Sequence, residues 1–176
     1  NVLGHVGIRQ GLKGPNACIT HHSISGLLAL VEATAALRAG GCNRAGVVAR
    51  DAPHEPQALL YYHQLGLMSA QGLRPFDARH DGSAMGEGAA SLTLETEAAA
   101  IERGAPVLGE VLGFGSGGEA LGLLPVRDDG DGLVRAIRAA LANAGLQPAD
   151  VGLIVAHGNG TPNSDRSEAR ALVQVF

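Results

Sequence analysis

One segment constrains the fold more than any other, because it changes from strand to helix character within a few residues. It covers residues 14–30 and reads GPNACITHHSISGLLAL. Residues 17–20 form a short apolar, partly β-branched run, which predicts a buried strand. From Ser25 the apolar residues follow a helical period to residue 39, where two glycines end the pattern. A strand that leads directly into a helix indicates an α/β protein.

A second junction of the same kind lies far along the chain, at residues 151–161 (VGLIVAHGNGT). The continuous apolar run at 151–156 is typical of a strand that is buried on both faces. It ends in His157 and a glycine-rich turn. One junction therefore carries a hydroxyl group, on Ser23, and the other an imidazole, which together are what an acyl-transfer site needs.

The rest of the chain alternates between strand and helix patterns. Asp165, followed three residues later by Glu168, resembles a capping pair at the start of a final helix. Further strands are predicted at residues 46–49, 89–94 and 107–114. Further helices are predicted before residue 12, through residues 59–63, at 96–103, and at 133–144, where Gly145 ends an amphipathic pattern.

Composition narrows the possible functions. Hydrophobic residues make up 45% of the chain and charged residues 17%, which predicts a globular protein whose core, with 3% aromatic residues and 26 glycines, consists of small aliphatic side chains. A net charge of −4 without any basic run disfavours nucleic-acid and membrane binding. No apolar stretch is long enough to span a bilayer and the first residues have no signal-peptide pattern, so we expect a cytoplasmic protein. Cys18 and Cys42 are isolated, which indicates neither a metal knuckle nor a disulfide framework.

Four segments together resemble the β-ketoacyl synthase family of the thiolase-like superfamily. They follow one another in the family's order and at similar spacings, and they cover most of the chain. They are residues 14–30 (the nucleophile segment), 74–95 (RPFDARHDGSAMGEGAASLTLE), 102–115 (ERGAPVLGEVLGFG) and 156–172 (AHGNGTPNSDRSEARAL).

The resemblance implies a thiolase-like fold with αβαβα layers, usually dimeric. It also implies that residues 1–176 form a single region, in which 1–95 end the N-terminal half and 96–176 begin the C-terminal half. Complete members have further strands before this region. After it they carry a lysine, a second active-site histidine and a Gly-Phe-Gly-Gly loop. The chain is therefore expected to be the central part of a ketosynthase: a fragment, a split subunit or a portion of a longer protein.

The resemblance also assigns the two candidate catalytic residues. In a working synthase a cysteine at the strand-to-helix junction takes an acyl group from an acyl-carrier protein, and two histidines promote decarboxylation of a malonyl unit. Here Ser23 occupies the cysteine position, and His157 matches the first histidine. A thiol has a pKa of about 8.5 that such a site can lower to roughly 3.5–7.5, whereas a serine needs a neighbouring base. His22 is adjacent, but in extended chain it would point to the opposite face.

Other polar residues are assigned structural roles more readily than chemical ones. His21 and His22 lack a third ligand at useful spacing, so no metal is expected. Arg79, Asp81 and Glu87 suit ion pairs and turn bonds, and Asn159 replaces the threonine common in the family. The glycines at 115–118 lack the lysine of a phosphate-binding loop, so no cofactor is expected.

Three functions remain open. The first is a non-condensing homologue, similar to chain-length factors, that shapes the acyl tunnel of an active ketosynthase. The second is an enzyme that acylates Ser23, or decarboxylates with His157, on acyl-carrier-protein thioesters. The third is a fragment without independent activity. The expected partners are an acyl-carrier protein and a ketosynthase-type subunit in a homo- or heterodimer.

Overall fold

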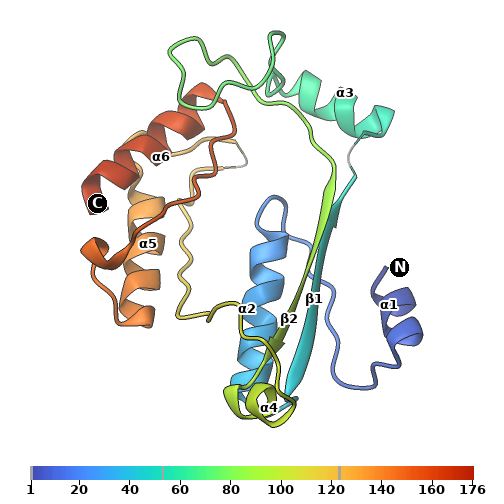
Figure 1. Ribbon diagram of the computed structural model, residues 1–176. Coiled ribbons are helices and arrows are strands. Elements are labelled where there is room, and N and C mark those ends of the chain that lie inside the picture. The colour runs from blue at the N-terminus through green and yellow to red at the C-terminus, as the bar shows by residue number, and fades with distance from the viewer. Residues whose placement is uncertain (1, 53, 123) are drawn as a thin grey trace. The chain divides into compact units, whose positions relative to one another are not determined.

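The computed structural model describes residues 2–52, 54–122 and 124–176 as a mixture of helices and a small sheet (Figure 1). These residues divide into two compact units. The first joins the chain through Ala52 to Glu87–Val111, and the second joins the stretch that ends at Gly86 to Leu112–Phe176. Helices and strands thus occur together, as the α/β pattern of the sequence predicts.

The first unit is built on a pair of antiparallel strands, whose register runs from Arg44 opposite Glu95 to Asp51 opposite Gly88. These strands confirm the ones predicted at 46–49 and 89–94, and the helices at 25–39 and 96–103 are confirmed as well. The elements are α1 (Val2–Gln10), α2 (Ser25–Arg38), β1 (Arg44–Asp51), β2 (Gly88–Glu95) and α4 (Glu97–Glu102).

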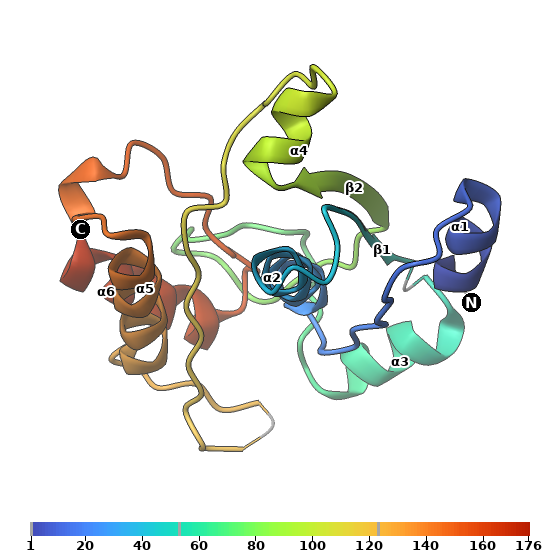
Figure 2. The same ribbon diagram turned by 90° about the horizontal axis from the view of Figure 1, so that it is seen from below.

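Helix α2 packs along the strand pair, as both ribbon views show (Figures 1 and 2). Val47 of β1 is buried beneath it. Gly26 permits a close approach, because a Cβ atom at that position would lie 3.1 Å from the Cβ of Ala49. Thr34 is buried on α2 at little cost, because its hydroxyl donates to the carbonyl of Leu30 at 2.8 Å.

The second unit is centred on two long helices that lie side by side (Figure 2). Its elements are α3 (Pro56–Gln64), α5 (Asp131–Ala144), a 3-10 turn η1 (Pro148–Asp150) and α6 (Pro162–Val175). Val134, Leu141 and Ala171 form the buried contact between α5 and α6. Helix α5 begins two residues before the predicted position 133, and its predicted end is confirmed. Gly145 follows the helix with a left-handed φ of 69°, a conformation that other residues disfavour.

Glycines allow backbone to lie directly on α5. A Cβ atom at Gly115 would lie 2.1 Å from the carbonyl oxygen of Ala136, and one at Gly130 would lie 2.5 Å from the carbonyl oxygen of Ser167 on α6. Both positions therefore exclude any side chain. The glycine-rich stretch from residue 115 therefore packs against the helix.

Three predicted strands are absent from the described residues. Residues 17–20, 107–114 and 151–156 belong to no helix or strand there. An isolated bridge between His21 and Ser23 lies just after the first of these segments. A strand forms only when a neighbour supplies its hydrogen-bond partners. None of the described residues does so for these segments, although their sequences carry the expected apolar pattern.

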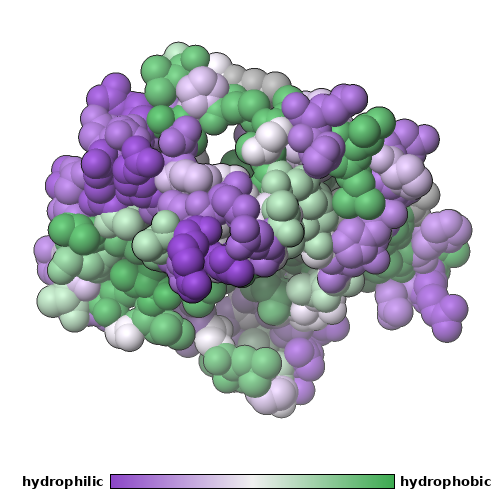
Figure 3. Space-filling model, turned by 90° about the horizontal axis from the view of Figure 1, so that it is seen from above, coloured by the Kyte–Doolittle hydropathy of each residue, from purple (hydrophilic) through white to green (hydrophobic). Residues whose placement is uncertain are grey.

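The burial expected for residues 17–20 and 151–156 is wrong for the same reason, and the predicted strand at 107–114 is mostly exposed as well. Leu153 and Val155 are 81% and 88% exposed, and Leu108 is 98% exposed. The face shown in Figure 3 carries several patches of apolar residues between hydrophilic ones. Apolar side chains at such exposure gain none of the stabilisation that burial provides.

Candidate functional site

The turn before α2 holds Ser23 in an exposed position. The hydroxyl of Ser25 accepts from the backbone N–H of His21 and donates to the carbonyl of His22, each at 2.7 Å. His22 adopts a left-handed φ of 47°. The turn is therefore closed by Ser25, and Ser23 lies two residues before the first residue of α2.

The prediction that His22 points away from Ser23 assumed extended chain, and that assumption is wrong. A left-handed residue breaks the alternation of side chains along a strand. Within the described part of the chain, the hydroxyl of Ser23 makes no hydrogen bond. The described residues of the first unit therefore hold no hydrogen-bonded base against this hydroxyl.

The turn that carries His157 is fixed by a carboxylate of α6. Glu168 is 8% exposed and accepts from two consecutive backbone N–H groups, those of His157 at 2.7 Å and Gly158 at 2.8 Å. Gly158 and Gly160 both have positive φ, of 46° and 78°, which a glycine adopts without strain. The backbone of this turn is thus determined by its own glycines and by one side chain.

The side chain of Asn159 links the imidazole to the next residue of the turn. Its Oδ1 accepts from the backbone N–H of Thr161 at 2.9 Å and from the Thr161 hydroxyl at 2.8 Å. Its Nδ2 lies 3.3 Å from Nε2 of His157. His157 is exposed and Asn159 is half-buried, so the imidazole stays open to a ligand.

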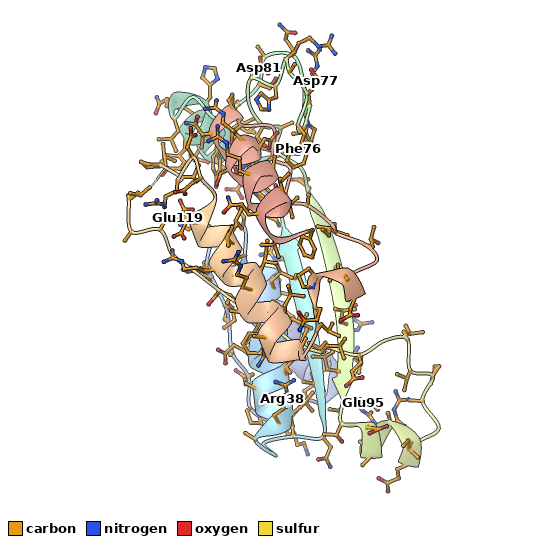
Figure 4. The ribbon with its side chains drawn as sticks, turned by 90° about the vertical axis from the view of Figure 1, so that its left-hand side faces the viewer. Arg38, Phe76, Asp77, Asp81, Glu95 and Glu119 are labelled. Atoms are coloured by element: carbon orange, nitrogen blue, oxygen red, sulfur yellow. The ribbon has the colours of Figure 1, made fainter. Side chains whose placement is uncertain are left out.

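Asp165 joins this turn to a second loop. It is 1% exposed and accepts from the N–H of Gly160 at 3.0 Å and from the N–H of Phe76 at 2.7 Å. Nδ1 of His80 lies 3.2 Å from its second oxygen. Figure 4 shows Phe76 close to the first turns of α6, and Asp77 in the same loop. Three partners satisfy a buried carboxylate that would otherwise be costly.

The predicted capping role of Asp165 and Glu168 is therefore wrong. Helix α6 begins after Thr161, and neither carboxylate caps it. Their spacing of three residues places both on one face of the helix, where they hold the His157 turn and the Phe76 loop. The three-residue spacing of these carboxylates was visible in the sequence. It was interpreted as a helix cap, whereas the carboxylates bind two loops that precede the helix in the chain.

The polar residues of the loop at 74–81 make local bonds. The guanidinium of Arg79 binds both oxygens of Asp77 at 3.1 and 3.2 Å. This contact lowers the pKa of Asp77 to about 2. Asp81 accepts from the hydroxyl of Ser69. These bonds agree with the structural role expected for Arg79 and Asp81.

No group of three or more histidine, cysteine, aspartate or glutamate residues that could hold a metal ion occurs among residues 2–52, 54–122 and 124–176. Over the same residues, none of the helices has the length and apolar character required to cross a membrane. Ser23 lies in the first unit and His157 in the second, so the pairing of hydroxyl and imidazole stays a prediction.

A helix preceded by an exposed serine turn, and a histidine turn held by helix carboxylates, agree with the class that the sequence motifs indicate. Two family models match the chain: "Beta-ketoacyl synthase, N-terminal domain" over residues 2–100 and "Beta-ketoacyl synthase, C-terminal domain" over residues 108–176. The chain belongs to the β-ketoacyl synthase family, and the resemblance drawn from the four motifs is confirmed.

Individual relatives agree with this assignment. The chain is 32% identical to 3-oxoacyl-(acyl-carrier-protein) synthase 2 of Staphylococcus aureus over 178 residues, which is 98% of this chain and 44% of the relative. The chain thus spans less than half the length of this curated relative.

Solved structures confirm the thiolase-like ketosynthase fold. One is a type II PKS acyl-carrier protein in complex with its ketosynthase, with a TM-score of 0.93, 29% identity and coverage of 98% of this chain and 44% of that one. Another is a ketosynthase in complex with its chain length factor from Xenorhabdus doucetiae, with a TM-score of 0.88, 25% identity and coverage of 99% and 41%.

Proposed function

We propose that this chain belongs to a β-ketoacyl synthase homologue of fatty-acid- or polyketide-type biosynthesis that pairs with an active ketosynthase and does not itself condense acyl chains. In this role it shapes the tunnel in which the partner's acyl chain grows, as a chain-length factor does. The single observation that carries the proposal is the serine at position 23. The resemblance of this chain to the family places a nucleophilic cysteine at that position.

The chemistry of the two side chains supports this role. The N-terminus of a helix carries partial positive charge and favours a thiolate, whose parent thiol has a pKa of about 8.5. A serine hydroxyl is far less acidic, so the same helix end cannot ionise it and a general base is required. The Ser23 hydroxyl is exposed, and its turn is closed by bonds of Ser25 that do not involve it.

The relatives supply the class of partner. One similar structure is described as a ketosynthase with its chain length factor, and another as an acyl-carrier protein with its ketosynthase. We infer from them that this protein meets an acyl-carrier protein and a ketosynthase-type subunit.

A second candidate function is acyl transfer by Ser23 with His157 as its base. The observation that favours it is the support of the His157 turn: both oxygens of Glu168 hold its backbone while the imidazole stays exposed. A turn fixed in this way suits an imidazole that takes part in chemistry.

Mass spectrometry separates the two candidates. The natural protein is incubated with acyl-carrier-protein thioesters, alone and with a co-purified ketosynthase. We expect no acyl adduct on Ser23, together with a change in the length of the partner's products when this protein is present. An adduct on Ser23 that disappears in Ser23→Ala would refute the non-condensing role and establish the acyltransferase.

A substitution that restores the cysteine tests whether position 23 is the nucleophile position. Because the turn around position 23 is complete, Ser23→Cys is expected to introduce acylation at that residue. Ser91→Cys, which places a thiol at an exposed position of β2, is the matched control and should remain unacylated. If both variants are acylated to the same extent, the site has no special reactivity and the assignment of position 23 fails.

A further inference from the structure

The protons on His157 can be assigned from the bonds of its neighbour Asn159. A backbone N–H can only donate, so the Asn159 atom 2.9 Å from the Thr161 nitrogen must be the amide oxygen. The Thr161 hydroxyl reaches the same atom at 2.8 Å. The orientation of the amide is thereby fixed, and its NH₂ group faces the imidazole.

An amide NH₂ group can only donate hydrogen bonds. Its contact with Nε2 of His157, at 3.3 Å, is a hydrogen bond only when Nε2 presents a lone pair. A neutral imidazole with a bare Nε2 carries its proton on Nδ1. The bonds of Thr161 therefore determine, through Asn159, which nitrogen of His157 is protonated.

We propose that Asn159 is a positioning residue that holds His157 in the neutral tautomer with the proton on Nδ1, so that Nε2 acts only as an acceptor. The inference rests on the proposed function in one respect, that His157 faces an acyl thioester. Decarboxylation of a malonyl-type thioester places negative charge on the thioester oxygen, which hydrogen-bond donors stabilise. If Nε2 of His157 accepts a hydrogen bond from Asn159, it cannot donate one to the thioester oxygen. This agrees with a subunit that does not catalyse condensation.

The surrounding turn keeps this arrangement in place. Glu168 holds the N–H groups of His157 and Gly158, and Asp165 holds the N–H of Gly160 at 3.0 Å. The backbone on both sides of Asn159 is thus fixed by buried carboxylates. A short, fixed backbone leaves the Asn159 amide within reach of both Thr161 and the imidazole.

Nitrogen NMR of the ¹⁵N-histidine-labelled natural protein measures the tautomer directly. The His157 resonances are assigned by their loss in His157→Gln. We expect Nε2 to resonate as an unprotonated nitrogen and Nδ1 as a protonated one. In Asn159→Asp the side chain of the same shape can only accept, so the proton should move to Nε2. Asn143→Asp, the same change on α5 where the amide oxygen accepts from the N–H of Phe114, should leave the His157 resonances unchanged.

The native spectrum alone can overturn the proposal, because a proton on Nε2 contradicts it whether or not any variant folds. An unchanged His157 pattern in folded Asn159→Asp also contradicts it. Asn159→Thr provides a second variant, since a hydroxyl both donates and accepts, and we expect it to give a mixture of tautomers. None of these spectra requires a ketosynthase partner, so loss of the chain-length effect with the tautomer as expected would reject the proposed function alone.

Discussion

Glu168→Gln tests whether one side chain of α6 holds the turn that carries His157. The carboxylate uses both oxygens, one for the N–H of His157 and one for the N–H of Gly158, and only 8% of the residue is exposed. Glutamine has nearly the same shape but one oxygen. It keeps one of the two bonds and turns an NH₂ group toward the other N–H.

The expected loss in the free energy of unfolding follows from the one hydrogen bond that is broken. A hydrogen bond to a charged group contributes about 1.5–3 kcal/mol, and a part-buried donor left without a partner costs about 1–3 kcal/mol. These two figures describe the same broken bond, so we expect a total loss of about 2–3 kcal/mol. For a chain of 176 residues that unfolds as a whole, that loss lowers the melting temperature by roughly 4–12 °C. If the turn opens locally, exchange of the two amides should accelerate roughly 30- to 160-fold.

Hydrogen exchange of the His157 and Gly158 amides, followed by NMR next to a thermal melt, measures both effects. Glu102→Gln, at an exposed position of α4, is the control and should change neither. The reasoning fails if Glu168→Gln melts within about 1 °C of the native protein and both amides keep their protection. It also fails if the two variants lose stability equally.

Three further predictions concern packing, capping and charge. Gly115→Ala should destabilise the second unit by at least about 1–3 kcal/mol in urea unfolding, because its new Cβ would lie 2.1 Å from the carbonyl oxygen of Ala136. Thr96→Ala should cost about 0.5–1 kcal/mol in the same assay, because the hydroxyl of Thr96 caps α4. The pKa of Asp77 is lowered to about 2, chiefly by its hydrogen bond from Arg79, so the stability that this pair contributes is complete above the unfolded value of 3.8 and is lost as the pH falls through 2. The difference in melting temperature between the native protein and Arg79→Gln should therefore shrink from pH 5 toward pH 2, and a difference that grows would contradict the assigned shift.

The elements that the sequence predicted well are those determined by nearby residues. Helix α5 has a regular apolar face and ends at Gly145, where the left-handed backbone is the one glycine adopts readily. Strands β1 and β2 each find their partner within the first unit. The strands predicted at residues 46–49 and 89–94 therefore form.

The strands that were predicted wrongly needed something the sequence pattern does not contain. The apolar side chains of residues 151–156 are suited to a buried sheet. Their pattern does not identify the strand with which this segment would pair. The chain spans 44% of a curated relative, and residues outside this span cannot be read from its pattern. The pattern of Asp165 and Glu168 failed differently, because a carboxylate near a helix start can bind its own helix or a distant loop.

The two unusual residues of the candidate site act in the same chemical direction. On the proposed function, Ser23 replaces a cysteine nucleophile whose thiol would ionise at the helix end. Asn159 leaves Nε2 of His157 able only to accept a hydrogen bond. The groups around them are intact: Ser25 closes one turn, and the buried Asp165 has three partners that offset its desolvation. A scaffold that had lost its packing would leave that carboxylate unsatisfied. On the proposed function, the difference from a condensing enzyme therefore concerns the reactivity of these two side chains. Single substitutions at the two positions should alter the chemistry without unfolding the turns that carry them.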